Sequence, residues 1–197
     1  MSEVRSTFRL KLGDPAPDFS LPDPSGVSHA LAELQGPAGL LLMFACNHCP
    51  YVIHLAKPLA ELADEMKPKG LHAVAISSND TEKYPQDGPE QMKEFAIQSG
   101  WHFPYLYDAT QEVALAYGAA CTPDFFLFDA QGALFYTGQF DNSRPKNGQH
   151  ADGKDLRDAI QRMLNGQSPP NSVYPSSGCN IKWKPGLQPD WWASGNA

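Results

Sequence analysis

Residues 38–50 read AGLLLMFACNHCP, and this stretch indicates the fold of the whole chain. Residues 38–45 are a continuous apolar run, as expected of a β-strand that is buried on both faces. Residues 46–50, CNHCP, then place two thiols three residues apart where a helix begins. Pro50 is typical of a first helical turn, because the N–H that it lacks would have no partner there. The stretch therefore predicts a buried strand that leads into a cysteine pair at a helix N-terminus.

On either side of this stretch, strand and helix patterns alternate. Apolar residues recur at helical spacing from His48 to about Lys67, and the apolar run Leu71 to Ser77 predicts a second buried strand. The other expected elements are a helix opened by Pro89, a strand over 103–107, a helix over 111–117, a hairpin of strands 124–128 and 133–140, and a helix over 153–165. This order predicts an α/β fold, with a central mixed sheet flanked by helices and the hairpin added antiparallel.

The pattern assigns most of the chain to one domain with a segment at each end. We expect a lead-in over 1–12, a domain over 13–166, and a tail over 167–197. The tail holds five prolines and three of the four tryptophans. We expect it to pack on the domain, because Trp183, Trp191 and Trp192 would be costly to leave in water.

The composition of the chain argues against nucleic acid and membranes as partners. The 197 residues carry a formal net charge of −7, which is a poor match for nucleic acid or an anionic membrane. The N-terminus lacks the apolar core of a signal peptide, and no apolar run approaches the ~18 residues of a membrane span. We therefore expect a cytoplasmic protein. In a reducing compartment, its four cysteines favour redox chemistry or metal binding over structural disulfides.

The spacing of Cys46 and Cys49 allows them to close a small disulfide. We expect the helix N-terminus to lower the pKa of Cys46 and make it the nucleophile, with the more buried Cys49 as the resolving thiol. The imidazole of His48 would add to the stabilisation of the Cys46 thiolate and make the pair more oxidising. The alternative is half of a zinc site, for which a second cysteine or histidine pair is missing.

Several stretches resemble known proteins. The lead-in GDPAPDFSL at 13–21 resembles the opening of the redoxin branch of the thioredoxin superfamily, which includes peroxiredoxins and cytochrome-maturation thioredoxins. Thr122-Pro123 resembles the Thr–cis-Pro pair that faces the Cys-x-x-Cys of this fold. Three more stretches resemble a group of small bacterial thioredoxin-family proteins with a CNHCP motif: CPYV at 49–52, CTPD at 121–124 and GCNIKW at 178–183. The resemblance covers roughly residues 10 to 186.

This resemblance implies a thioredoxin-like fold and a thiol–disulfide oxidoreductase. Cys46 takes the place of the nucleophile and Cys49 that of the resolving thiol. Pro123 takes the place of the cis-proline, and Thr122 would offer its backbone to an extended substrate. The resemblance implies no bound cofactor and no metal. The expected partners are protein or small-molecule thiols and disulfides, together with a thiol electron donor.

Thioredoxin carries a buried carboxylate in the strand before its motif, and this chain departs from that pattern. Residues 39–45 contain no acid, so the general base for Cys49 is not evident from the sequence. Asp124 and Glu61 are poor substitutes for it.

Two other functions compete with disulfide exchange. The first is a thiol peroxidase, because the lead-in of this chain resembles that of peroxiredoxins. Peroxiredoxins, however, have a Pro seven residues before the peroxide-reactive cysteine and a Thr three residues before it. Before Cys46 these positions hold Gly39 and Met43, so the motif supplies no hydroxyl to orient a peroxide. The other alternative is a metal-binding or adaptor protein that uses the fold without turnover.

Cys121 and Cys179 stand apart from the motif. A single cysteine is most simply a small buried apolar residue. Because Cys121 directly precedes Thr122, it should lie near the motif. The sharper hypothesis pairs Cys121 with Cys179 as a second redox pair, or uses one of them to relay electrons to Cys46 and Cys49.

Overall fold

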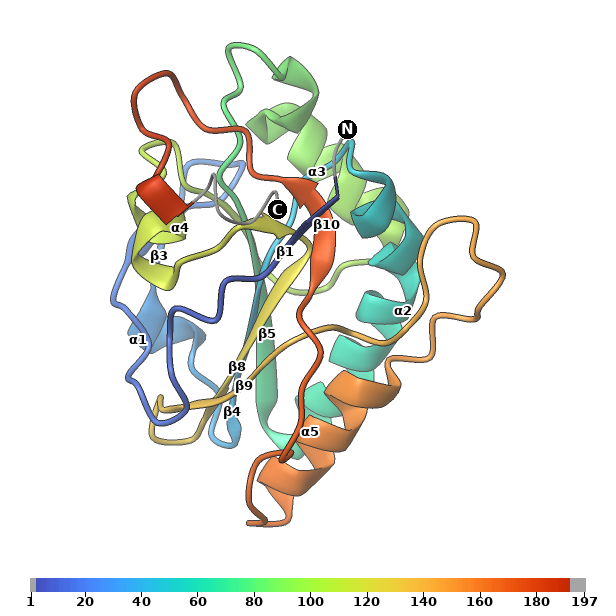
Figure 1. The fold of residues 1–197 in the computed structure, drawn as a ribbon. Coiled ribbons are helices and arrows are strands. Elements are labelled where there is room, and N and C mark those ends of the chain that lie inside the picture. The colour runs from blue at the N-terminus through green and yellow to red at the C-terminus, as the bar shows by residue number, and fades with distance from the viewer. Residues whose placement is uncertain (1–2, 192–197) are drawn as a thin grey trace.

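A mixed sheet forms the centre of the computed structural model, which describes residues 3–191 (Figure 1). Its strands lie in the order β6–β5–β4–β8–β9. The β5–β6 pair is parallel, the β4–β8 and β8–β9 pairs are antiparallel, and Ala45 N–H at the end of β4 bonds to Ile76 O of β5. The strands are β4 (Gly39–Phe44), β5 (Leu71–Ser77), β6 (Tyr105–Tyr107), β8 (Asp124–Asp129) and β9 (Leu134–Thr137). The fold is therefore the α/β class expected from the sequence.

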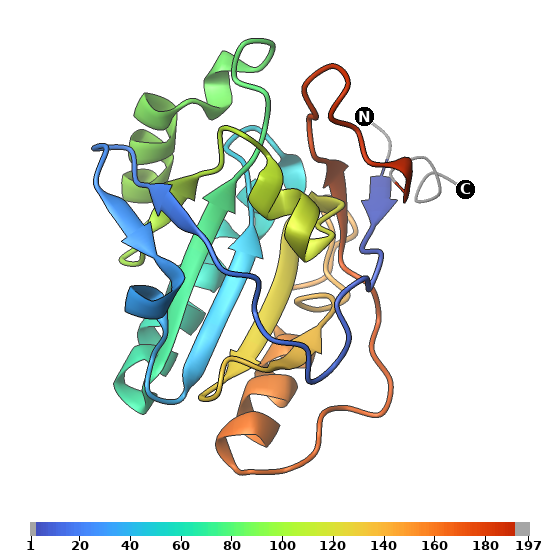
Figure 2. The same cartoon turned by 90° about the vertical axis from the view of Figure 1, so that its left-hand side faces the viewer.

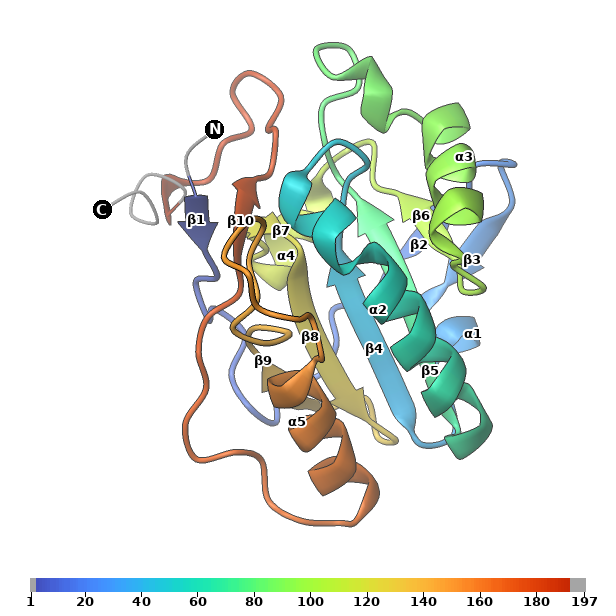
Figure 3. The same ribbon diagram turned by 90° about the vertical axis from the view of Figure 1, so that its right-hand side faces the viewer.

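The strands divide their side chains between two apolar layers, as a period of two residues requires. In β4, Leu41 and Met43 pack into one cluster. Leu40, Leu42 and Phe44 pack into the other. Figure 3 shows α2 and α5 over the first face, and Figure 2 shows the side of the sheet that α1 and α4 cover. The helices are α1 (Leu31–Leu34), α2 (Pro50–Met66), α3 (Pro89–Ser99), α4 (Glu112–Tyr117) and α5 (Lys154–Leu164).

Helix α2 positions the cysteine motif. Its buried residues Val52, Leu55, Leu59 and Leu62 recur at helical spacing and face the sheet. The helix begins at Pro50 rather than at His48, because Cys49 keeps an extended conformation (φ −71°, ψ 120°) as the N-cap. Within residues 3–191, no helix combines the length and the apolar character needed to cross a bilayer.

A smaller sheet joins segments that are far apart in the sequence. Strand β10 (Ser177–Asn180) lies between β1 (Glu3–Arg5) and β7 (Cys121–Thr122), antiparallel to both (Figure 1). Trp183, just beyond β10, is buried and packs edge-on against Trp191. Trp192, which we also expected to pack, lies outside the described residues.

The remaining regular elements are short. Strands β2 (Ser20–Pro22) and β3 (Ser28–Ala30) form an antiparallel pair, and Lys67–Lys69 and Pro85–Asp87 are 3-10 turns. The second of these turns contributes to the site described next.

Candidate active site

Cys46 and Cys49 lie in the irregular turn between β4 and α2. Both thiols are buried, with 1% of Cys46 and none of Cys49 exposed. All four cysteines of the chain lie in the described part and are thiols. Cys49 is the residue at the helix N-terminus, whereas Cys46 precedes it by three positions.

Thr122 links the two thiols from a distant part of the sequence. The Cys49 thiol donates to the Thr122 carbonyl oxygen across 3.1 Å, and the Thr122 hydroxyl lies 3.3 Å from Cys46 Sγ. The peptide bond between Thr122 and Pro123 is cis. The structure thus brings together four of the residues singled out from the sequence, namely Cys46, Cys49, Thr122 and Pro123.

The electrostatics of the thiols differ from our expectation. Burial acts to raise the pKa of Cys49, but hydrogen bonds from Cys179, from Cys46 and from the Val52 N–H outweigh it, and the pKa is lowered. The pKa of Cys46 is raised by its hydrogen bond to Cys49, by burial and by the negative charge of Asp87. The expectation that the helix lowers the pKa of Cys46 is therefore wrong. The helix starts later, so its free N–H groups reach Cys49 instead.

Asp87 is a buried carboxylate beneath the motif that the sequence analysis missed. It accepts hydrogen bonds from the Asn47 N–H (2.9 Å), the His48 N–H (3.3 Å) and the Asn79 side chain (2.9 Å). His48 Nδ1 lies 2.7 Å from its second oxygen. A carboxylate only accepts, so His48 donates from Nδ1 and its imidazole is held by Asp87 rather than by the thiols.

A second set of contacts fixes the turn from outside. The His48 ring stacks on Tyr84 with 5.7 Å between ring centres and 6° between planes. Lys182 Nζ lies 5.7 Å from the centre of the same Tyr84 ring. Tyr105 donates to the Asn47 side-chain oxygen across 3.1 Å. The turn is therefore held in one conformation by its neighbours.

Cys179 joins the two motif thiols, and Cys121 does not. In the β10–β7 pair, Cys179 lies opposite Thr122 and Asn180 lies opposite Cys121. Successive side chains of a strand point to opposite faces, so Cys179 and Cys121 lie on different sides of this sheet. Cys179 is hydrogen-bonded to Cys49, while Cys121 donates to Pro123 O at 3.5 Å and packs with Val4. The predicted pair of Cys121 with Cys179 does not fit this arrangement.

The pairing of β10 also corrects our expectation for Thr122. We expected its backbone to receive an extended substrate. The structure places Cys179 of the chain's own tail at that position. Gly178 makes this approach possible, since a Cβ at that residue would collide with the Thr122 carbonyl group.

Neither acid named as a substitute base contacts the motif thiols. Glu61 is exposed on α2. Asp124 is fully buried and accepts from the Ala120 N–H at 3.2 Å, and burial raises its pKa to about 6. Its negative charge raises the pKa of Cys121, which packs in a cluster separate from the motif thiols.

One cluster in residues 3–191 has the donors of a metal site. Cys46, His48 and Asp87 each offer one ligand atom, and these atoms lie within 4.8 Å of one another. A thiolate, an imidazole and a carboxylate suit zinc. A metal there would displace the hydrogen bond between His48 and Asp87.

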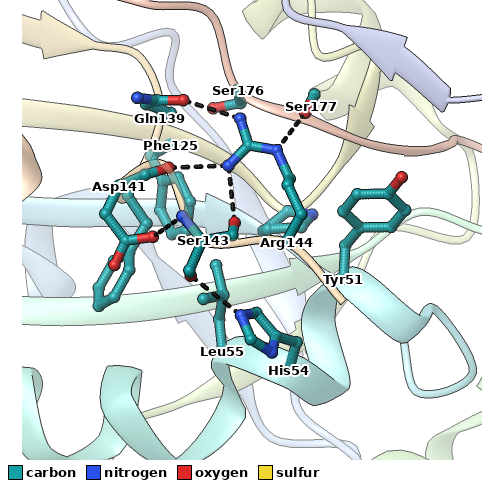
Figure 4. Close-up of a pocket in the computed structure, with 12 residues that line it drawn as sticks. Tyr51, His54, Leu55, Phe125, Gln139, Asp141, Ser143, Arg144, Ser176 and Ser177 are labelled. Carbon is teal, nitrogen blue, oxygen red and sulfur yellow. Dashed lines mark hydrogen bonds between the residues drawn. The ribbon is translucent and has the colours of Figure 1, made fainter. Parts of the chain in front are cut away.

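A pocket beside Pro123 shows how the tail is held (Figure 4). The Arg144 guanidinium donates to Ser177 Oγ at 2.9 Å and to Gln139 Oε1 at 2.7 Å. It also donates to the carbonyl oxygens of Asp141 and Ser143. Arg144 therefore ties the loop after β9 to the start of β10.

Comparison with known proteins shows that the chain is similar to thiol redox proteins. The sequence profile of the AhpC/TSA family matches residues 12–137. Peroxiredoxin Bcp of Escherichia coli is 29% identical over 150 residues, which cover 70% of this chain and 90% of that protein. Thiol-disulfide oxidoreductase ResA of Bacillus thuringiensis is 28% identical over 126 residues, which cover 64% of this chain and 68% of that protein.

Solved structures show the same fold. An uncharacterised conserved protein from Geobacillus kaustophilus is 47% identical, with a TM-score of 0.91 over 95% of this chain and 99% of that one. The thioredoxin domain of a thiol-disulfide oxidoreductase from Bacteroides vulgatus is 18% identical, with a TM-score of 0.61 over 79% of this chain and 99% of that domain. The second match supports the architecture alone.

Proposed function

Since this chain belongs to the AhpC/TSA family and has the thioredoxin fold, we propose that it is a thiol–disulfide oxidoreductase that works through Cys46 and Cys49. Its family and its relatives establish a thiol redox role. The finer assignment is supported by one observation: both motif thiols contact the same residue, Thr122. This shared contact, together with the hydrogen bond between Cys46 and Cys49, supports a reaction in which the two sulfurs form and break a bond with each other.

The proposed reaction reduces a substrate disulfide in two exchange steps. The Cys46 thiol is hydrogen-bonded to Cys49 and has a raised pKa, so it gives its proton to a solvent base before it attacks. The Cys46 thiolate attacks one substrate sulfur, the Cys46–substrate bond forms, and the other substrate sulfur leaves as a thiolate that is then protonated. The Cys49 thiolate, which the lowered pKa of this thiol favours, then attacks Cys46. The Cys46–Cys49 bond forms, the Cys46–substrate bond breaks, and the second substrate sulfur leaves as a thiolate that is then protonated.

An external thiol system would return the pair to its reduced form, and no bound cofactor takes part. The partners proposed are therefore protein or small-molecule disulfides as substrates and a dithiol as the electron donor. The oxidised enzyme can run the same steps in reverse, and its reduction potential against that of the partner decides the direction.

The proposal is tested by the reduction of insulin disulfides with dithiothreitol as the electron source. We expect wild-type protein to accelerate the reaction and the Cys46→Ser variant to lose that acceleration. Cys121→Ser is the matched control, because Cys121 is equally buried but lies outside the motif. Activity of Cys46→Ser equal to that of the wild type would contradict the proposal.

A thiol peroxidase is the second candidate, and one observation favours it. The motif carries no threonine before Cys46, but Thr122 brings a hydroxyl to 3.3 Å from Cys46 Sγ from elsewhere in the chain. Peroxiredoxin Bcp is among the relatives. Consumption of hydrogen peroxide by the protein, with dithiothreitol as the electron donor, separates the two functions. Peroxide turnover faster than insulin reduction would favour the peroxidase, and stoichiometric consumption only would favour disulfide exchange.

A further inference from the structure

The third thiol of the site, Cys179, has no part in the reaction proposed above. It lies in β10, within the same buried cluster as Cys46 and Cys49, and is 3% exposed. It is hydrogen-bonded to Cys49. A thiol in contact with one member of a disulfide-forming pair is a potential second partner for that member.

The backbone fixes Cys179 at this place. Its pairing opposite Thr122 sets it on the residue that contacts both motif thiols. Glu3 pairs with it from the other side, so β10 is held by a strand at each edge. Gly178 admits the close approach to Thr122, and Arg144 anchors the preceding Ser177. The strand pairing, the small residue at 178 and the Arg144 anchor together hold Cys179 in a defined position beside the motif thiols.

The place of β10 beside Thr122 is also the one that an extended substrate would take. A peptide that adds to the free edge of a strand is held by backbone hydrogen bonds, and its side chains are presented at fixed intervals. Strand β10 occupies that edge of β7 and presents a cysteine to the thiol pair. The chain thus carries its own thiol where the thiol of a substrate is expected.

We propose that Cys179 is a third redox-active thiol, and that Cys49 forms a disulfide with Cys179 as an alternative to Cys46–Cys49. The proposal rests on the function proposed above, since it starts from the oxidised motif. Thiolate Cys179 attacks Cys49, the Cys49–Cys179 bond forms and the Cys46–Cys49 bond breaks. Cys46 leaves as a thiolate and takes the proton that Cys179 released, so no net oxidation occurs.

As a consequence, the three sulfurs have different roles: Cys46 is the nucleophile, and Cys49 and Cys179 store the disulfide. The exchange returns Cys46 to its thiol form while the two oxidising equivalents stay on Cys49 and Cys179. The nucleophile is then available before the external donor has acted. Closing the new bond requires the two sulfurs to move from hydrogen-bond contact to about 2.05 Å.

The test uses the full-length Cys46→Ser variant, in which Cys49 can form an internal disulfide only with a cysteine outside the motif. The reduced variant is treated with oxidised glutathione, quenched with acid, alkylated and digested without reduction for mass spectrometry. We expect an internal Cys49–Cys179 disulfide and two glutathione molecules released per protein. Cys46→Ser/Cys179→Ser should instead keep glutathione on Cys49, and Cys46→Ser/Cys121→Ser should behave like Cys46→Ser.

Identical glutathione adducts on Cys49 in Cys46→Ser and Cys46→Ser/Cys179→Ser would overturn the proposal. Cys46→Ser/Cys179→Ala gives a second comparison, and circular dichroism checks that each variant folds. Wild-type protein mapped in the same way separates this proposal from the one on which it rests. If the wild type forms Cys46–Cys49 and the variant forms no internal disulfide, only the role of Cys179 is wrong. If neither Cys46 nor Cys49 of the wild type enters an internal disulfide, the proposed function itself is wrong.

Discussion

The thiol of Cys49 donates a 3.1 Å hydrogen bond to the carbonyl oxygen of Thr122, 73 residues further along the chain. The same threonine reaches Cys46 with its hydroxyl. These two contacts join β7 to the turn before α2, and the peptide bond from Thr122 to Pro123 is cis. The chemistry of the motif therefore depends on a residue outside it.

The first prediction concerns that hydroxyl. Thr122→Val keeps the shape of the side chain and removes the hydrogen bond that lowers the pKa of Cys46. A hydrogen bond of this kind is worth about 0.5–1.5 kcal/mol, so insulin reduction should slow by roughly two- to tenfold. Thr137→Val is the matched control, because within the described residues the buried Thr137 hydroxyl has no hydrogen-bond partner. Equal rates for the two variants would count against a role for the Thr122 hydroxyl.

The second prediction concerns the buried carboxylate. The negative charge of Asp87 is one cause of the raised pKa of Cys46, so Asp87→Asn should lower that pKa. Alkylation of Cys46 by iodoacetamide, followed by mass spectrometry against pH, should then be several-fold faster near neutral pH. Glu61→Gln removes an exposed acid from α2 and should leave the titration unchanged. A Cys46 titration that stays in place, or moves to higher pH in Asp87→Asn, would refute the assignment.

The third prediction concerns Gly178. A Cβ there would collide with the Thr122 carbonyl oxygen and lie 2.7 Å from its carbon, and neither backbone atom can rotate away. Gly178→Ala should lower the free energy of unfolding by about 1–3 kcal/mol in a denaturant titration. In Gly88→Ala the nearest atoms are 3.2 Å away, so that control should be much less affected. A Gly178→Ala protein as stable as the wild type would mean that β10 is not held tightly against Thr122.

The fourth prediction concerns the pH dependence of stability. Burial raises the pKa of Asp124 from 3.8 to about 6. Between these values the folded protein holds a proton that the unfolded chain has released, so this group's stabilising contribution falls as the pH rises through that window. Asp124→Asn should therefore be more stable than the wild type above pH 6, by about 3 kcal/mol, with the difference disappearing below about pH 4.

Denaturant titrations of both proteins from pH 4 to pH 8 check this prediction. All other carboxyl groups titrate in both proteins, so their effects cancel in the difference. A difference in unfolding free energy that is constant across this range would show that Asp124 does not titrate as its burial requires.

The fold could be predicted where its periodic signals are local. The apolar run before the motif and the helical spacing of Val52 and Leu59 marked β4 and α2 because burial repeats along one segment. Strand β10 gave no such signal. Its sequence, SGCN, has no apolar alternation, and its place depends on pairing with β1 and β7, which are far away in the chain.

The site could be predicted only in part for the same reason. Cys46 and Cys49 are recognisable by spacing, and Thr122-Pro123 by resemblance. Asp87 lies in a polar 3-10 turn where an acid is usually solvated, and only the folded loop brings it under the motif. The direction of the thiol pKa shifts was mispredicted because it depends on where the helix begins, and a shift of two residues moved its N–H groups from Cys46 to Cys49.

The most direct test of the central claim is a redox titration of the wild-type protein in glutathione buffers of defined potential, with the disulfides mapped at each point. We predict one reversible two-electron transition in which Cys46 and Cys49 become bonded to each other. A midpoint near −270 mV would be that of a reductase, and one between about −180 and −120 mV that of an oxidant or isomerase. If the two residues stay open to alkylation at every potential, or carry only separate glutathione adducts, the motif is not a redox couple and the account is contradicted.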